Sequence, residues 1–238
     1  MTGEEKERLG RLLNDKGWDL YNGISSGKPD QDSAIHWFEK AVAFGYPTAM
    51  VNLGNIYEHR EDYEKAYHWY LEAALAGDKK GIFNIANMYY NGQYVDQNYK
   101  KAYDYFMQLA RNEDPDAYFY LGIYAEHGYL EKPDYEKAAD YYRKAIRLGS
   151  KESPVNLGWL YCNGKGVPLD LEKCFEYYLL GYARGDSLAC ADLGHCYEDG
   201  QGIERDMNKA LAFYREGAER GEKNCLEALE RLKAAKEG

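Results

Sequence analysis

An aromatic pair recurs along the chain at an almost constant interval. From the second copy onward the interval is 36 residues, and between the first two copies it is 32. A fixed period in this range is typical of stacked structural repeats, in which each unit contacts mainly its neighbours. The chain is therefore expected to present a surface that holds something, not a pocket for chemistry. The pairs are Trp37-Phe38, Trp69-Tyr70, Tyr105-Phe106, Tyr141-Tyr142, Tyr177-Tyr178 and Phe213-Tyr214.

Capping residues surround each pair at a fixed spacing and delimit one helix. Eight residues after the first aromatic residue stands a glycine in five of six copies, with Glu113 as the exception. Glycine there is typical of the left-handed turn that ends a helix. Seven residues before the first aromatic residue stands an Asp or Asn, whose side chain can accept from the free N–H groups of a first helical turn. These predicted N-caps of the second helix of each repeat are Asp30, Asp62, Asn98, Asp134, Asp170 and Asp206.

A second marker lies before each of these helices and predicts a first helix in every repeat. A glycine inside a helix costs about 1 kcal/mol relative to alanine, so its recurrence indicates the close approach of another helix. In copies two to six a Leu or Ile such as Leu121 precedes the marker and is expected in the core. The marker residues are Gly17, Gly54, Ala86, Gly122, Gly158 and Gly194.

These spacings predict an all-α fold, an α-α superhelix (solenoid) of six antiparallel helix pairs in one domain over residues 1–238. No sustained period-two alternation competes with this interpretation. A capping helix is expected at about 222–236, with Leu226, Leu229 and Leu232 on its inner face. The predicted repeats cover about 4–45, 46–77, 78–113, 114–149, 150–185 and 186–221.

Two stretches carry a family resemblance. Residues 156–170, NLGWLYCNGKGVPLD, and residues 192–210, which begin Asp192-Leu193-Gly194 and end Lys209-Ala210, resemble the Sel1-like repeat, a longer-looped relative of the tetratricopeptide repeat. The resemblance covers nearly the whole chain, although the second repeat has a loop four residues shorter and the third has Ala86 at the marker. It implies an adaptor or scaffold that binds other proteins, and it implies no catalytic residue.

Charge and hydropathy narrow the class of partner. The net charge is −10 and the pI about 5.1, which argues against nucleic acid because such binding needs a basic surface. The sequence contains no run of 18 apolar residues, so no membrane span is predicted. The five cysteines do not fall at equivalent positions of successive repeats, so we expect reduced thiols and a cytoplasmic protein. A secreted effector is the alternative location.

Two motifs could suggest chemistry. Gly23-Ile24-Ser25-Ser26-Gly27 matches the hydrolase pattern G-x-S-x-G, but no strand is expected before Ser25. Cys190, His195 and Cys196 are possible zinc ligands, yet on one helix they point in different directions. We therefore expect no catalytic residue, no metal site and no cofactor.

The first helices are expected to line a concave groove through the positions three before, one after and four after the marker, here called −3, +1 and +4. These positions vary between copies, whereas the core positions do not, so packing does not dictate them. The alternative is a register shifted by one residue, with the aromatic side chains packed inside. The predicted groove residues are Trp18, Tyr21, Asn55, Glu58, Phe83, Asn87, Tyr90, Phe119, Ile123, Glu126, Trp159, His195 and Glu198.

The composition of this groove predicts its partner. Exposed aromatic residues such as Phe119 and Trp159 are typical of interfaces. Because the groove contains glutamates and no Lys or Arg, the expected partner is a neutral to basic peptide or helix of another protein. Two other classes were weighed: a carbohydrate-binding module that stacks sugars on Trp18, Phe83 and Trp159, and a hydrolase that depends on Ser25.

Overall fold

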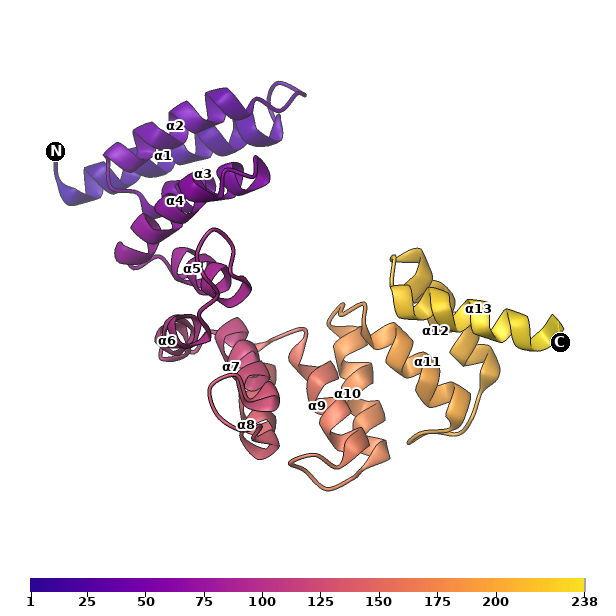
Figure 1. The fold of residues 1–238 in the computed structure, drawn as a ribbon. Coiled ribbons are helices and arrows are strands. Elements are labelled where there is room, and N and C mark those ends of the chain that lie inside the picture. The colour runs from indigo at the N-terminus through magenta and orange to yellow at the C-terminus, as the bar shows by residue number, and fades with distance from the viewer. Residues whose placement is uncertain (238) are drawn as a thin grey trace. The chain divides into compact units, whose positions relative to one another are not determined.

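The protein is built from helices alone over the residues that the structure describes. The computed structural model describes residues 1–237, and within them lie thirteen helices and no strand. The predicted all-α class is therefore confirmed. Twelve of the helices form six consecutive hairpins, and α13 (Lys223–Glu237) follows the last hairpin (Figure 1).

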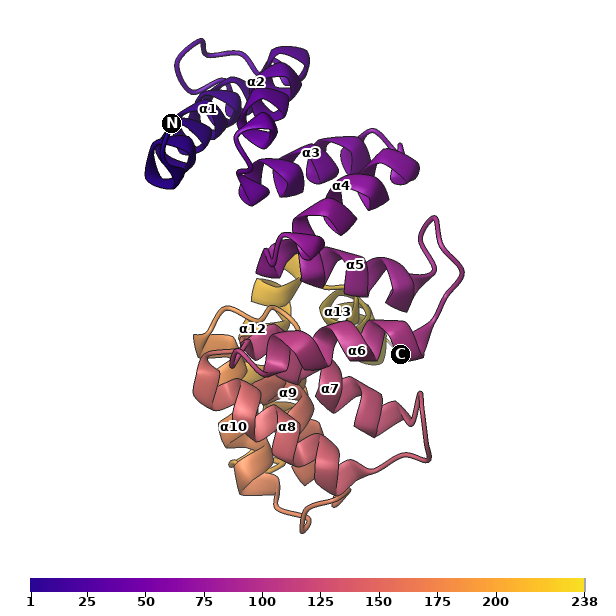
Figure 2. The ribbon, with the colours of Figure 1, turned by 90° about the vertical axis from the view of Figure 1, so that its left-hand side faces the viewer.

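Each hairpin consists of a first helix and the second helix that follows it in the chain (Figure 2). The first helices are α1 (Gly3–Asn22), α3 (Pro47–His59), α5 (Lys79–Asn91), α7 (Pro115–His127), α9 (Ser153–Asn163) and α11 (Ala189–Asp199). The second helices are α2 (Gln31–Ala43), α4 (Tyr63–Leu75), α6 (Tyr99–Ala110), α8 (Tyr135–Leu148), α10 (Leu171–Ala183) and α12 (Met207–Glu219).

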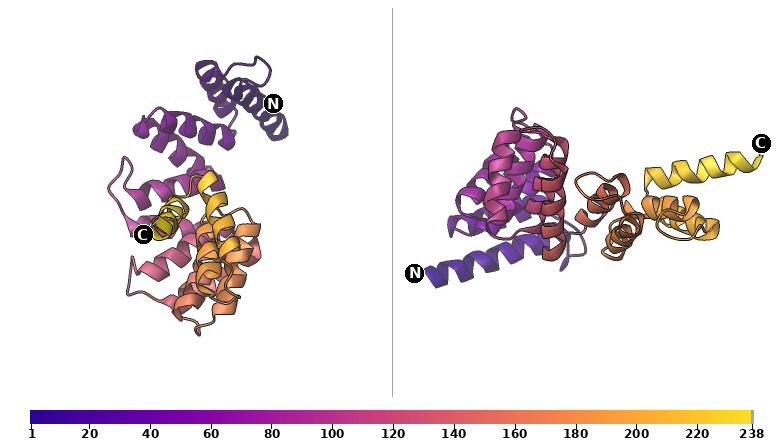
Figure 3. Two further views of the ribbon diagram at one scale, coloured as in Figure 1. Left: turned by 90° about the vertical axis from the view of Figure 1, so that its right-hand side faces the viewer. Right: turned by 90° about the horizontal axis from the view of Figure 1, so that it is seen from below.

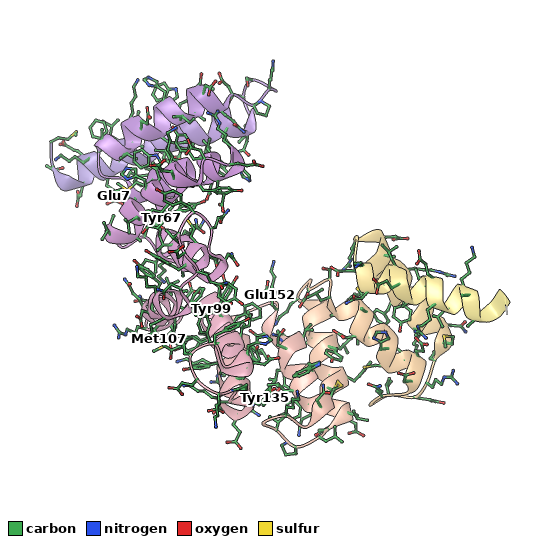
Figure 4. The ribbon with its side chains drawn as sticks, in the orientation of Figure 1. Glu7, Tyr67, Tyr99, Met107, Tyr135 and Glu152 are labelled. Carbon is green, nitrogen blue, oxygen red and sulfur yellow. A yellow bond between two sulfur atoms is a disulfide. The ribbon has the colours of Figure 1, made fainter. Side chains whose placement is uncertain are left out.

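The chain divides into two compact units. Unit one runs from Met1 to Leu109 and unit two from Ala110 to the C-terminus, so the division falls near the end of α6. Each unit buries its own apolar side chains between neighbouring hairpins. In unit one, for example, Tyr67 of α4, labelled in Figure 4, belongs to such a contact. Its ring meets that of Tyr89 of α5 edge to face, with ring centres 6.2 Å apart. Aromatic contacts thus join one repeat to the next.

The predicted helix caps are confirmed. All six Asp or Asn side chains accept from the backbone N–H three residues later, at 2.9–3.3 Å. Such a bond contributes about 1 kcal/mol to the stability of a helix. Glu113, the one non-glycine residue at the left-handed position, still adopts φ +55°. The turn is therefore imposed by the repeat even where no glycine favours it.

The marker glycines exist because an aromatic ring lies directly on them. A Cβ atom at Gly54, Gly122 or Gly194 would stand 2.3–2.4 Å from the ring of the tyrosine that is the second residue of the following aromatic pair. Contacts that short do not occur between real atoms, so only glycine permits this packing. The predicted close approach is confirmed, and the approaching group is the partner helix's ring.

The inner face of α13 differs from the prediction. Leu226 is 46% exposed, whereas Cys225 and Ala228 are buried, with Leu229 and Leu232 packed beside them. These four residues follow the i, i+3, i+4, i+7 spacing of one helical face. The prediction was wrong for Leu226 because the leucines alone were used to set the rotation of the helix.

The prediction of five reduced cysteines is wrong for two of them. Cys162 and Cys174 form a disulfide across one hairpin, with Cα atoms 5.2 Å apart. Cys190, Cys196 and Cys225 are free and buried. The comparison of successive repeats missed the bond because it joins α9 to α10 within a single repeat, where Cys174 replaces the usual alanine.

Replacing Gly122 by alanine should destabilise the protein by about 1–3 kcal/mol, because the new methyl group displaces the Tyr142 ring. The loss should appear in urea unfolding followed by circular dichroism, although alanine is the better helix former. Gly3→Ala, at a helical glycine with nothing within 4 Å, is the matched control and should not destabilise. Unchanged or increased stability of the Gly122 variant would contradict the packing argument.

Alkylation of the unfolded, unreduced protein should label three thiols, those of Cys190, Cys196 and Cys225. Reduction before alkylation should raise the number to five, because it opens the Cys162–Cys174 bond. Mass spectrometry of the intact protein and of its peptides measures both numbers. Five labelled thiols without reduction would show that the bond does not form.

Candidate functional site

The predicted groove positions form one face along the first helices of each unit, here called the first-helix face. Its +1 residues include the most exposed aromatic side chains of the set, with Trp18 46% and Trp159 37% exposed. His195 is also exposed, and Asn55, Asn87 and Ile123 are half-buried. This face therefore presents large side chains that the core does not require.

The −3 residues lie deeper than the +1 residues. Phe83 packs edge to face on Phe106, with ring centres 6.0 Å apart, and Phe119 lies 6.3 Å from the Tyr142 ring. Both are half-buried. In other repeats this position is buried outright, as at Val51. Phe83 and Phe119 thus contribute to hairpin packing as well as to the surface.

In alternate repeats a tyrosine of the second helix donates a hydrogen bond to the +4 glutamate of the first helix. Burial raises the pKa of Tyr70 and Tyr214, and the nearby carboxylate of Glu58 or Glu198 raises it further. Both phenols therefore stay protonated and act as donors. The ring that packs on the marker glycine therefore also fixes a surface carboxylate. The pairs are Tyr70–Glu58 at 2.7 Å, Tyr142–Glu126 at 2.6 Å and Tyr214–Glu198 at 2.8 Å.

Unit one has a small pocket beside Trp18. Its volume is about 150 Å³, and the Trp18 ring stacks on Tyr21 with centres 5.8 Å apart. The Tyr21 hydroxyl lies 3.2 Å from Nδ1 of His59, which ties the first repeat to the second. The pocket is mainly apolar with amide groups at its edge. It is lined by Trp18, Tyr21, Phe38, Asn52, Asn55, Ile56 and His59.

Unit two has a larger pocket beside Trp159, here called the Trp159 pocket. Its volume is about 240 Å³, and it contains the carboxylates of Glu126 and Asp192. Neither carboxylate forms an ion pair with any residue that the structure describes. Asn156 donates to the Tyr142 hydroxyl at 3.1 Å, and this hydroxyl donates to Glu126, so the Glu126 carboxylate is held in place. The pocket is lined by Glu126, Val155, Asn156, Trp159, Tyr178 and Asp192.

Asp192 has an altered protonation equilibrium. Burial and the charge of the nearby Asp186 raise the pKa of Asp192 to about 7. Asp186 is itself buried, and one of its carboxylate oxygens has no hydrogen-bond partner in the described part of the chain. The Trp159 pocket therefore contains a carboxyl group that changes charge near neutral pH.

Glu198 differs from the other two glutamates because α13 covers it. Arg231 of α13 donates to both of its carboxylate oxygens at 2.7 Å, and Glu198 is 9% exposed. Arg231 holds the pKa of Glu198 below its ordinary value. In Figure 3, α13 runs along α12 towards the C-terminus. The +4 glutamate of the last repeat is thus not open, contrary to the expectation from its position alone.

The two asparagines among the predicted groove residues have different surroundings. The Tyr70 hydroxyl lies 2.8 Å from Oδ1 of Asn55 and 2.7 Å from Glu58, so its single proton serves both oxygens and Asn55 already has a hydrogen-bond partner. The Oδ1 atom of Asn87 is buried and has no hydrogen-bond partner among residues 1–237. Only Asn87 therefore keeps a spare acceptor. Tyr90, the +4 residue of the same helix, lies 5.6 Å from the Tyr99 ring.

The two motifs with possible chemistry are used for structure. The Ser25 hydroxyl and backbone N–H both donate to Asp19, at 2.7 and 3.0 Å, which fixes the loop between α1 and α2. Cys190 and Cys196 are buried, and the His195 ring rests on Tyr214, 5.5 Å between centres. No group of three or more His, Cys, Asp or Glu residues in the described chain could hold a metal ion.

The sequence reasoning missed one row of site residues. Asn52, Asn156 and Asp192 line the two pockets, and all three stand two residues before the marker glycine. A polar side chain recurring beside the core leucine was the signal that could have identified this position. Arg231 was not predicted because α13 was expected only to cap the repeat array.

The chain belongs to the Sel1 repeat family. The family's model matches six repeats, at residues 17–43, 47–78, 80–114, 115–150, 155–186 and 187–222. This agrees with the six hairpins and with the resemblance of residues 156–170. No curated protein matches the chain. None of the described helices is long and apolar enough to cross a membrane.

Solved structures share the fold. A Sel1 repeat protein from Oxalobacter formigenes is 29% identical with a TM-score of 0.78, over 97% of this chain and 89% of that one. The protective antigen c5321 of uropathogenic Escherichia coli is 25% identical with a TM-score of 0.77, over 93% of this chain and 49% of that one. The immunity protein PA5088 from Pseudomonas aeruginosa, at 17% identity, a TM-score of 0.61 and coverage of 91% of this chain and 83% of that one, shares the fold alone.

Asp192→Asn should increase stability at pH 8 by a few kcal/mol and change it little near pH 4. The reason is that the folded pKa, about 7, lies above the unfolded value near 3.8, so the wild type loses stability as pH rises through this window. Urea unfolding of both proteins from pH 4 to 8 measures the difference. The exposed Asp199→Asn is the matched control, and parallel stability profiles for wild type and Asp192→Asn would contradict the prediction.

Proposed function

We propose that this protein is a non-enzymatic scaffold that binds a peptide or helical segment of a partner protein along the concave groove lined by its first helices. Sel1 repeat proteins are generally protein-interaction scaffolds, and the chain belongs to that family. The observation that carries the proposal is the pair of pockets beside Trp18 and Trp159, where exposed tryptophans stand next to fixed polar groups. Aromatic anchors in such surroundings are typical binding hot spots.

The partner we propose is neutral to basic. The protein carries a net charge of −10, and neither Glu58 and Glu126 of the first-helix face nor Asp192 of the Trp159 pocket has an ion-pair partner among the described residues. Complementary charge favours association and selects against acidic partners. The carbohydrate-binding alternative gains no support from the family, and one of its three platforms, Phe83, packs on Phe106.

The cytoplasmic location stays a prediction. It depended on reduced thiols, and the Cys162–Cys174 disulfide argues against it because such bonds persist mainly in oxidising compartments. The secreted alternative weighed from the sequence agrees better with this bond.

Trp159→Ala should weaken partner binding by about 2 kcal/mol, because it removes the most exposed aromatic anchor of unit two. The immobilised protein is used to capture partners from an extract, and each captured protein is purified and titrated against wild type and variant. Leu179→Ala, at an exposed leucine of α10 away from the pockets, is the matched control. A partner that is lost equally from both variants, or from neither, would contradict binding on the first-helix face.

A further inference from the structure

The last repeat shows what its glutamate binds. Glu198 receives two hydrogen bonds from the Arg231 guanidinium, in addition to the bond from the Tyr214 hydroxyl. Two parallel N–H···O bonds are the geometry in which arginine recognises a carboxylate best. The arginine comes from a helix that packs on the repeat without belonging to a hairpin. This part of the chain is therefore an internal example of a helix bound through an arginine.

Arg231 stands at a position that the repeat defines. It follows His195 by 36 residues, and His195 follows Trp159 by 36, so Arg231 continues the +1 series into α13. In both places the +1 residue of the later helix faces the +4 glutamate of the earlier repeat: Arg231 faces Glu198, and Trp159 lines the same pocket as Glu126. The two sites thus share the tyrosine–glutamate pair, and Trp159 stands beside Glu126 where Arg231 stands beside Glu198.

The position next to Glu126 is open. Tyr142 fixes the Glu126 carboxylate as Tyr214 fixes that of Glu198, at 2.6 and 2.8 Å. Arg231 covers Glu198, whereas Glu126 borders the Trp159 pocket of about 240 Å³, which Asp192 also lines. Two carboxyl groups and Trp159 border this space, and no cation of the described chain pairs with either carboxyl group.

We propose that the Trp159 pocket binds an arginine side chain of the partner polypeptide, with Glu126 as its carboxylate, in the way that Glu198 binds Arg231. Asp192 supplies a second acceptor, and Trp159, Val155 and Tyr178 surround the aliphatic part of the side chain. This inference rests on the proposed scaffold function and names the chemistry of its partner. A self-associating copy of this chain is an alternative occupant that the test must separate.

Arginine fits the pocket better than lysine for two reasons. A planar guanidinium reaches both oxygens of a carboxylate at once, whereas an ammonium group acts as a point charge. A guanidinium also stacks on an indole ring, and the Trp159 ring already has the Lys165 ammonium 4.7 Å from its centre. Lys165 is not among the residues that line the pocket, so it leaves Glu126 unpaired.

The test uses arginine with both ends blocked, N-acetyl-L-arginine methylamide, as the probe for the full chain. The signal is the indole N–H resonance of Trp159, assigned with Trp159→Phe, and the comparison probes are blocked lysine and blocked citrulline, the neutral analogue of arginine. We expect a saturable shift with arginine, weaker binding of lysine and no binding of citrulline. Glu126→Gln should weaken arginine binding about tenfold or more, because it removes a charge-assisted bond.

Two further variants make the result decisive. Glu176→Gln, at an exposed glutamate of α10, is the matched control and should bind arginine as the wild type does. Arg231→Ala uncovers Glu198 and should create a second arginine site, which calorimetric titration of the full chain counts as a second bound equivalent, because the Trp159 resonance reports only on its own pocket. If arginine binds the uncovered Glu198 but not the Trp159 pocket, or if citrulline binds equally well, the proposal is overturned.

The scaffold function can fail separately. If the pocket ignores arginine while captured partners still depend on Trp159, this inference fails and the scaffold stands. If arginine binds but capture yields no polypeptide that depends on Trp159, the pocket stands and the scaffold fails.

Replacing each arginine of a captured partner by citrulline should reduce its affinity at one position, and a partner unaffected at every position would overturn the inference. Sedimentation velocity of the full chain tests whether a second copy of the chain occupies the Trp159 pocket. A dimer that is lost in Glu126→Gln would show that it does, and would contradict the proposal.

Discussion

The packing of an aromatic ring on a glycine is the contact on which the rest of this structure depends. A Cβ atom at Gly54, Gly122 or Gly194 would stand within 2.4 Å of a tyrosine ring, so in these three hairpins the ring reaches the first helix because the side chain is missing. The tyrosine hydroxyl then emerges beside the first helix and donates to the +4 glutamate. Core packing and surface chemistry are therefore joined through a single side chain.

This connection explains why the glutamates alternate along the chain. Where the packed ring is tyrosine and the +4 residue is glutamate, the hydroxyl has an acceptor and the carboxylate has a fixed direction. The first and third repeats have Phe38 and Phe106 at the ring position and tyrosines at +4, so no such pair forms. In the fifth repeat the +4 residue is Cys162, which bonds to Cys174 instead. The variation among copies follows a pairing rule between two helices.

The sequence predicted the elements well and the site only in part. Caps and glycines are local signals, because they reflect the backbone of one turn, and they located every hairpin. The depth of a side chain depends on what packs against it, which spacing does not reveal. Phe119 shares its position with the buried Val155, yet it is half-buried against Tyr142. Leu226 points outward and Cys225 inward because the preceding hairpin, not the leucine spacing, sets the rotation of α13.

What the sequence by itself determined was the all-α repeat, its period and its caps, since these depend on residues close together in the chain. What only the tertiary structure decided was which groups from separate helices meet. The Cys162–Cys174 bond, the Arg231–Glu198 pair and the pocket shared by Glu126 and Asp192 join elements 12 to 66 positions apart. Their partners are chosen by the packing of hairpins in space, and no local spacing in the chain encodes that choice.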